Sequence, residues 1–279
     1  MKTANKIALA RLAYRAIHYA RGLAGYSDRS IVRRDGLCYD LDLSQGIDFA
    51  IYLGMFERAT RKALAGLVKP SAVVLDIGAN IGTHTMLLAE LVGPSGRVIS
   101  FEPSDFGVQK LRRNLSLNSA LADRVTLFHC FLAAEDGAAV PDKIYASWPL
   151  GDSEGLHQKH LGQAMPTNAA PGRTIDGILA ELGDPPIQLV KMDVDGFESE
   201  VLRGATALLR DHRPIFVMEL SPYVLVERGS SLDELLTFFV PNGYRFFHER
   251  TGDQLPSGPA ELRRLVGDGE SMNVVARAN

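Results

Sequence analysis

The chain has 279 residues, 46% of them hydrophobic, and its 33 acidic and 30 basic side chains leave a formal net charge of -3. That length suits one large α/β domain with appendages, or two small domains. The net charge supplies no positive field for a nucleic acid, so we expect no nucleic-acid partner.

Two further features predict a cytoplasmic protein. No stretch approaches the roughly twenty apolar residues that span a bilayer, and basic residues interrupt the apolar positions near the N-terminus, unlike the core of a signal peptide. Cys38 and Cys130 lie far apart and lack the spacing of a zinc site, so we expect them to be reduced thiols.

Residues 1–69 are expected to form an extension that packs on the main domain and covers one edge of its sheet or one end of a ligand cleft. Residues 1–25 have apolar positions at helical spacing and basic residues on another side, which predicts a basic amphipathic helix. Packing on its own domain is favoured over contact with an anionic membrane surface. Residues 30–42 predict a hairpin that turns at Asp35-Gly36, and residues 47–67 predict a helix containing Glu57.

Residues 70–279 are expected to form the main domain. Short apolar runs alternate with helical patterns, which predicts a doubly wound, mostly parallel, seven-stranded α/β sheet with ligands at the carboxyl ends of its strands. The predicted strands are residues 73–76, 97–102, 125–130, 188–193, 214–219, 244–248 and 273–276. The predicted helices are residues 84–92, 105–119, 174–182, 198–210 and 231–240.

One segment, residues 134–172, breaks this alternation. It is rich in Gly, Pro, Asp and His, and a long, weakly patterned segment in a compact domain is typical of a functional loop. We predict a substrate-side loop, in which Trp148 either stacks on the acceptor or anchors the loop. His157 and His160 have helical spacing, but without a third ligand they do not predict a metal site.

A glycine loop follows the first predicted strand, with the sequence Asp76-Ile77-Gly78-Ala79-Asn80-Ile81-Gly82. A dinucleotide-binding turn prefers GxGxxG, whose middle glycine lets a pyrophosphate approach, and Asn80 occupies that position here. Asp76 also places a negative charge at the mouth of the loop, which suits a cationic amino group better than a pyrophosphate. The loop, with Gly78 and Gly82 on either side of Asn80, therefore favours S-adenosylmethionine as the ligand.

Glu102 ends the second predicted strand, about twenty residues after the glycine loop, where a carboxylate can accept both ribose hydroxyls of an adenosine. NAD would use an acid at the same place. Glu102 thus supports an adenosine ligand without choosing the cofactor, and the loop favours S-adenosylmethionine over NAD.

Several acids follow two later strands. Asp193 and Asp195 are two residues apart and are expected to share a face, while Glu219 ends the next strand. Such carboxylates can act as a general base or as ligands of a divalent ion, and Asp195 and Glu198 can instead cap the following helix. Asp193 is the first candidate for the base, and Glu219 and His84 are the alternatives.

Short segments along the chain carry a family resemblance. They are residues 74–82, Phe101-Glu102-Pro103, residues 191–198, residues 201–205 and Met218-Glu219, with Gly54-Met55-Phe56-Glu57 upstream. Together they resemble the FkbM family of S-adenosylmethionine-dependent methyltransferases, and the Asp-Val-acid-Gly motif followed by Glu is the most specific of them.

The resemblance implies a Rossmann-like class I methyltransferase fold and assigns roles to individual residues. The residues that would line the methionine side of the cofactor are Asp76, Gly78, Asn80 and Gly82. Glu102 would hold the ribose, Glu57 would close over the cofactor, and Asp193 would face the transferring methyl group. The chain departs from the family where Asp195 replaces the common Glu and Phe56 the common Tyr, and Phe56 has no hydroxyl to donate.

The predicted activity is therefore O-methylation of a hydroxyl on a sugar, glycan or natural-product acceptor, with S-adenosylhomocysteine as the product. A Mg2+-assisted version, in which Asp193 and neighbouring acids hold the ion, is the alternative within the same chemistry. An NAD-linked oxidoreductase and a cofactor-binding protein without catalysis are the alternatives from other classes. A small-molecule or glycan acceptor is the expected partner.

Overall fold

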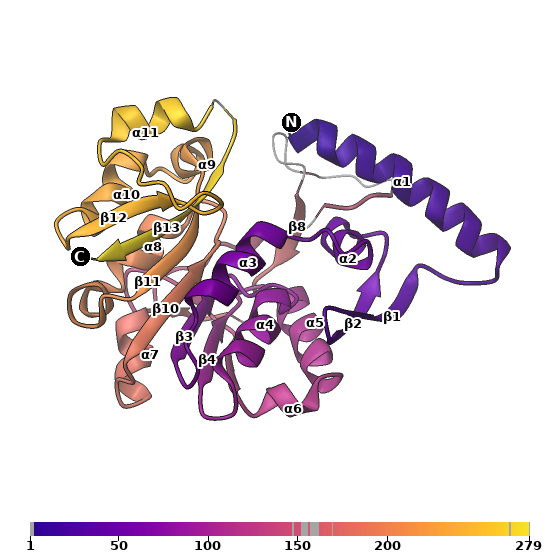
Figure 1. The fold of residues 1–279 in the computed structure, drawn as a ribbon, viewed down its shortest axis with the longest axis horizontal. Coiled ribbons are helices and arrows are strands. Elements are labelled where there is room, and N and C mark those ends of the chain that lie inside the picture. Colours follow the sequence, from indigo (N-terminus) through magenta and orange to yellow (C-terminus); the bar gives the residue numbers. More distant parts are fainter. Residues whose placement is uncertain are drawn as a thin grey trace.

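The computed structural model describes residues 3–146, 148–151, 156, 162–168, 170–267 and 269–278. Within these residues, seven strands form one sheet in the order β12-β13-β11-β10-β3-β4-β5 (Figure 1). The strands are β3 (Val73–Ile77), β4 (Arg97–Phe101), β5 (Val125–Phe128), β10 (Ile187–Met192), β11 (Ile215–Leu220), β12 (Tyr244–His248) and β13 (Met272–Ala278). β13 runs antiparallel to β11 and β12, and the other neighbouring pairs are parallel. The predicted mostly parallel, seven-stranded sheet is confirmed.

The order of the strands places the site. The chain builds β3, β4 and β5 outward in one direction and then returns to add β10 beside β3 on the other side. Ligands of doubly wound sheets bind at this switch point, outside the carboxyl ends of the strands. Apart from Asp76, Gln188 and Lys191, the central strands β3 and β10 are apolar, and they are largely buried on both faces, as is typical of strands covered by helices.

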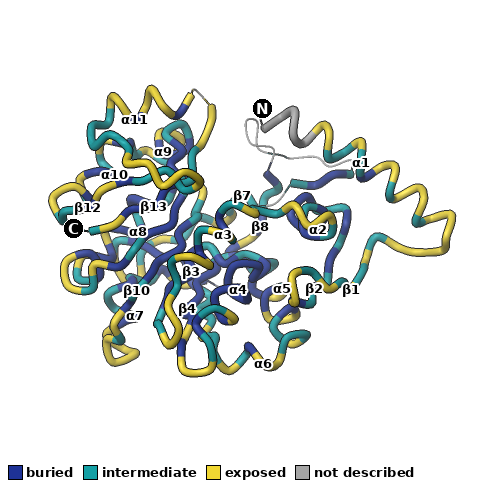
Figure 2. Tube along the Cα trace, in the orientation of Figure 1, coloured by how far each residue is buried: buried dark blue, intermediate teal, exposed yellow. Residues whose placement is uncertain are grey.

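Helices cover both faces of the sheet (Figure 1). They are α4 (Thr83–Val92), α5 (Asp105–Ser116), α6 (Ser119–Ala122), α7 (Ile175–Glu181), α8 (Glu198–Arg203), the π-helix η1 (Leu208–His212), α9 (Pro222–Glu227), α10 (Leu232–Phe239) and α11 (Pro259–Leu265). One buried cluster joins α7, α8, α10 and α11 to the sheet, and a second joins α4 to the opposite face. Figure 2 shows the resulting pattern, with the sheet strands buried and the outer turns exposed.

The N-terminal segment packs on the α4 face. It comprises α1 (Thr3–Leu23), the hairpin β1 (Arg29–Arg34) and β2 (Leu37–Asp42), then α2 (Gly46–Tyr52) and α3 (Arg58–Leu67). The hairpin turns at Asp35 and Gly36, whose φ values of 48° and 85° suit the predicted two-residue turn. α1 lies against α2, where the rings of Tyr14 and Phe49 meet edge to face at 5.9 Å (Figure 1).

Two predicted helices are each interrupted in the structure. The helix expected over residues 47–67 breaks between α2 and α3, where Gly54 and Glu57 have φ values of 67° and 37°. The helix expected over residues 198–210 ends at Arg203, and the π-helix η1 follows from Leu208. Between them, Gly204 packs so closely that a β-carbon there would lie 2.2 Å from the carbonyl oxygen of Ala133. Left-handed backbone interrupts the first predicted helix, and the second is interrupted at a closely packed glycine.

Residues 134–172 contain short strands. β7 (Lys143–Ala146) pairs antiparallel with β8 (Gln163–Pro166), and β6 (Phe131–Leu132) pairs with β9 (Gly172–Arg173). The carbonyl of Trp148 accepts a 2.6 Å hydrogen bond from the backbone N–H of Gly46, so this segment is attached to the start of α2. His157 and His160 lie outside the described residues. In the described part of the chain, no helix is long and apolar enough to cross a membrane.

Candidate active site

A row of polar side chains crosses the sheet at the switch point. Ser100 of β4, Asp76 of β3 and Lys191 of β10 are register partners on neighbouring parallel strands, on the face covered by α4. The Asp76 carboxylate is fully buried and accepts a 2.5 Å hydrogen bond from the hydroxyl of Thr85 on α4. Burial raises the pKa of Asp76, although the ammonium group of Lys191 lies 3.9 Å away and opposes the rise. Asp76 and Lys191 therefore form a buried ion pair beneath the glycine loop.

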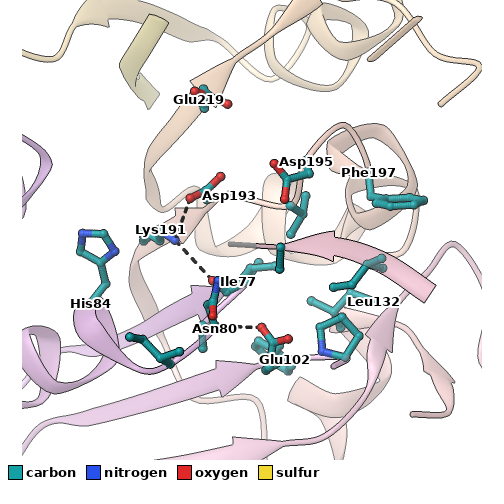
Figure 3. Close-up of a pocket in the computed structure, with 18 of the residues that line it drawn as sticks. Ile77, Asn80, His84, Glu102, Leu132, Lys191, Asp193, Asp195, Phe197 and Glu219 are labelled. Atoms are coloured by element: carbon teal, nitrogen blue, oxygen red, sulfur yellow. Dashed lines mark hydrogen bonds and ion pairs between the residues drawn. The ribbon is translucent and has the colours of Figure 1, made fainter. Parts of the chain in front are cut away.

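Lys191 connects this row to the surface of the cleft. Its ammonium group lies 3.5 Å from the carboxylate of Asp193 and 3.5 Å from the carbonyl oxygen of Gly78 (Figure 3). Burial alone would lower the pKa of Lys191, but the carboxylates of Asp193, Asp76 and Glu57 raise it above its ordinary value. Lys191 was not among the predicted site residues. A lysine inside an otherwise apolar strand was the available signal, because a buried charge requires a partner.

The glycines of the loop are required by packing within the protein. Gly78 has φ of 78°, and a β-carbon there would lie 1.9 Å from the carbonyl oxygen of Asp193. Gly82 has φ of 87°, and its β-carbon would lie 2.8 Å from Leu111. The loop can therefore lie against the end of β10 only because Gly78 carries no side chain.

The structure places two predicted site residues, Asp76 and Gly82, elsewhere than the sequence indicated. The Asp76 carboxylate, expected at the mouth of the loop, is buried behind it, because its strand neighbour Lys191 and Thr85 hold it inside. Gly82 packs against α5 through Leu111, whereas Gly78 and Asn80 line the cavity described below. Asp76 could therefore affect a ligand only indirectly, through Lys191 and the glycine loop.

The Glu102 carboxylate is held rigidly at the end of β4. It accepts hydrogen bonds of 2.7 Å from the backbone N–H of Asn80 and 2.9 Å from the backbone N–H of Ser104, and one of 2.5 Å from the Ser104 hydroxyl. Gly107 makes room for it, since a β-carbon there would lie 2.7 Å from the Glu102 carboxyl carbon. Burial raises the pKa of Glu102, and the hydrogen bonds to Ser104 and Asn80 oppose the rise. The glycine loop and Glu102 are thus tied together through Asn80.

A cavity of about 200 Å³, open to solvent, lies over these groups. We refer to it as the first cavity. Leu132 lies at its apolar side, near Glu102, and Lys191 and Asp193 lie at its polar end (Figure 3). Phe101 and Phe131 add apolar lining. The Asp193 side chain is 39% exposed. The first cavity therefore has a polar end and an apolar end, as a cofactor with a charged part and an adenine ring requires.

Glu57 and His84 meet at the polar end of the first cavity. The Glu57 carboxyl lies 3.3 Å from Nε2 of His84, and the ring of Phe56 lies 5.8 Å from that of His84. Desolvation and the charge of Asp193 raise the pKa of Glu57 to about 8, whereas burial and the charge of Lys191 lower the pKa of His84 well below 6.5. At neutral pH, a protonated Glu57 therefore faces an uncharged imidazole.

Replacing Glu57 with Gln should change how stability depends on pH. Folding raises the pKa of Glu57 from 4.5 to about 8. The contribution of Glu57 to the free energy of unfolding is therefore fully present below pH 4.5 and is lost as the pH rises through about 8. Between about pH 5 and about pH 9, the melting temperature of the unmodified protein should fall relative to that of Glu57→Gln. Glu90→Gln, at an exposed position on α4, is the control. If the melting temperatures of all three proteins changed with pH in the same way, the raised pKa of Glu57 would be contradicted.

The remaining predicted acids lie around the same region. Asp195 follows the end of β10, has φ of 48° and, like Asp193, lines the first cavity. The Glu198 carboxylate accepts a 3.3 Å hydrogen bond from the backbone N–H of Gly196 at the start of α8, and burial raises the pKa of Glu198 to about 7. Glu219, on β11, lines the first cavity as well (Figure 3). Within the described residues, no group of three or more His, Cys, Asp or Glu side chains could hold a metal ion.

Comparisons with known proteins agree with this architecture. Residues 76–246 match a family model described as the methyltransferase FkbM domain. The chain is 28% identical over 186 residues to the 2-O-methyltransferase NoeI of Sinorhizobium fredii, covering 63% of this chain and 74% of that protein. It is 29% identical over 156 residues to the methyltransferase sdnD of Sordaria araneosa, covering 47% of this chain and 59% of that one. The chain thus spans less than two thirds of the length of sdnD.

Solved structures resemble the chain more remotely. A cofactor-bound structure of Rv0187 from MTB superposes with a TM-score of 0.45 and 18% sequence identity, covering 80% of this chain and 81% of that one. At this level of similarity, the fold is established by the strand order of the chain itself.

Proposed function

Because this chain belongs to the FkbM family of methyltransferases, we propose that it transfers a methyl group from S-adenosylmethionine to a hydroxyl of a sugar, glycan or natural-product acceptor. One observation carries the proposal. A single cavity at the switch point of the sheet joins a rigidly held carboxylate, Glu102, to a partly exposed one, Asp193. The first suits an adenosine ribose and the second suits an acceptor hydroxyl. The similarity to a relative named as a 2-O-methyltransferase supports oxygen as the acceptor atom.

The residues of the first cavity fit this cofactor. The hydroxyl of Thr83, at the start of α4, is buried and lacks a hydrogen-bond partner among the described residues, so it is available to a ligand. Glu102 would hold the ribose, Gly78 and Asn80 would line the methionine side, and Glu57 would lie over it. Asp76 and Gly82 act as positioning residues, one through Lys191 and the other through the packing of the loop. When bound, the cofactor supplies an electrophilic methyl group.

Replacing Glu102 with Gln is expected to weaken S-adenosylmethionine binding by roughly ten- to a hundredfold, since the amide loses the charge-assisted hydrogen bonds of a carboxylate. Isothermal titration calorimetry measures the change. Glu90→Gln is the matched control because Glu90 lies on the exposed side of α4. Unchanged affinity in Glu102→Gln would remove Glu102 from the cofactor site.

We assign the proton transfer to Asp193. Its carboxylate lies at the polar end of the first cavity and is partly exposed, so an acceptor hydroxyl can reach it. His84 is the weaker candidate, because burial and the charge of Lys191 lower its pKa and disfavour the protonated imidazole. Glu219 lies on the neighbouring strand and is the alternative carboxylate. In this assignment, Asp193 accepts the hydroxyl proton as the oxygen attacks the methyl group.

Two measurements test the proposal. Calorimetric titration should give binding of S-adenosylmethionine and none of NAD, and the reverse result would favour an oxidoreductase. A screen over hydroxylated sugars, glycolipids and polyketides should release S-adenosylhomocysteine with at least one acceptor. If the cofactor binds and no acceptor yields product, the chain is a cofactor-binding protein. Loss of turnover on adding a chelator would favour the Mg2+-assisted version.

A further inference from the structure

A second cavity adjoins the first. It has a volume of about 890 Å³ and lies between α1, α2 and the strands β11 and β13. Its walls are mainly apolar: Leu9 and Ala13 come from α1, Leu53 from the end of α2, and Met218 and Met272 from the sheet. This volume lies near the upper end of the range of about 300–1,000 Å³ that is typical of sites for whole drug-sized ligands, so the cavity has room for more than a free monosaccharide.

The two cavities meet at the proposed catalytic residues. Glu57, Trp148, Lys191, Asp193 and Glu219 line both of them. A molecule in the second cavity can therefore reach Asp193 without occupying the first cavity. In-line transfer requires the acceptor oxygen to approach the methyl group from the face away from the sulfur, and two cavities that share Asp193 leave room for both reactants.

Apolar side chains stay exposed in this cavity. Leu9 is 61% exposed and Leu53 is 41% exposed, and each lines the second cavity. Exposed leucines around a concave surface leave apolar area that a ligand can bury, and burial of such area stabilises a complex by about 25 cal/mol per Å². The far rim is polar, with His248, Glu249 and Arg250.

The charge at the junction restricts the group next to the reacting hydroxyl. Asp193 and Glu219 are both acidic, and the ammonium group of Lys191 is already 3.5 Å from Asp193 and 3.9 Å from Asp76. An anionic group beside the reacting hydroxyl would be repelled. The junction therefore favours a hydroxylated group that carries no negative charge.

We propose that the second cavity is the acceptor subsite, and that the acceptor joins an uncharged hydroxylated group at Asp193 to an extended alkyl or acyl chain lying between α1 and the sheet. This inference rests on the proposed methyltransferase function and narrows its substrate class. α1 then has a role in recognition, because Leu9 and Ala13 form part of the wall.

Trp148 provides a direct assay. It is the single tryptophan of the chain and lines both cavities, so its fluorescence reports occupancy of the junction. Decyl β-D-glucoside below its micelle concentration should give a saturable change, and glucose at the same concentrations should give none. Decyl sulfate, which has the same chain and an anionic head, should bind at least roughly tenfold more weakly. Equal responses to glucose and decyl glucoside, or to the two decyl compounds, would overturn the proposal.

Two matched double variants test whether decyl glucoside binds in the second cavity. The double variant Leu9→Asn, Leu53→Asn removes two leucines of the cavity wall and should weaken decyl glucoside binding by about tenfold. The control is Leu12→Asn, Leu182→Asn, at positions that are 68% and 39% exposed and lie outside the cavity wall. The control should bind as the unmodified protein does. Equal affinities for the two double variants would show that the probe binds elsewhere and would overturn the proposal.

Calorimetry with S-adenosylmethionine separates this inference from the proposed function. If the cofactor binds and decyl glucoside does not, the acceptor subsite is wrong and the methyltransferase proposal stands. If the unmodified protein does not bind the cofactor, the proposed function itself fails. In the double variant Leu9→Asn, Leu53→Asn, unchanged cofactor affinity demonstrates that the fold and the first cavity are intact.

Discussion

The variant Asp193→Asn is expected to lower kcat by about 10²- to 10⁴-fold while retaining S-adenosylmethionine binding, because an amide cannot take the acceptor proton at neutral pH. Asn has nearly the same shape, and the backbone N–H of this residue still donates its 3.1 Å hydrogen bond to Ile77. The geometry of the end of β10 should therefore survive. Single-turnover release of S-adenosylhomocysteine measures the chemical step, and calorimetry measures cofactor affinity.

A matched control removes a carboxylate of the same kind elsewhere. Asp35 lies in the hairpin turn with a side chain that is 69% exposed, and its φ of 48° suits Asn. Asp35→Asn should have activity within about twofold of the unmodified protein, since the Asp35 carboxylate is largely exposed and lies in the hairpin turn, outside both cavities. Full activity in Asp193→Asn would exclude Asp193 as the base and would direct attention to Glu219.

Lys191→Met is expected to reduce the free energy of unfolding by about 3–5 kcal/mol, as for other buried ion pairs that lose one partner. The change leaves Asp76 fully buried, and Oδ1 of Asp76 has no hydrogen-bond partner among the described residues. Urea denaturation measures the loss. Lys143→Met, at an exposed position at the start of β7, should change stability by less than about 0.5 kcal/mol.

Replacing Asp76 with an uncharged residue in the Lys191→Met variant should restore part of this stability. In the double variant Lys191→Met, Asp76→Asn, the buried group is uncharged, so at least about half of the lost free energy should return. The pH dependence gives a second readout. Since burial raises the pKa of Asp76, the penalty in Lys191→Met should shrink as the pH falls and Asp76 becomes protonated. Additive effects of the two substitutions would contradict a direct Asp76–Lys191 interaction.

Lys191 illustrates where inference from the sequence stopped. The sequence predicted strands over residues 73–76 and 188–193, but not that Asp76 and Lys191 are register partners on the same face of the sheet. Register is set by packing across the whole sheet and is not encoded in either strand alone. Asp193 and Glu102 were predicted as site residues because each directly follows an apolar run, which places a polar side chain at the carboxyl end of a strand, and both line the first cavity.

The sequence by itself determined the seven strands, their mostly parallel arrangement and the family, because these depend on local alternation and on short motifs. Only the tertiary structure decided that Asp76 lies behind the loop, that Lys191 joins it to Asp193, and that α1 forms one wall of a second cavity. These features depend on how segments far apart in the chain are brought together, such as Leu9 and Met218, which line the same cavity. Long-range packing leaves no periodic pattern in either segment, so it becomes visible only when the chain is folded.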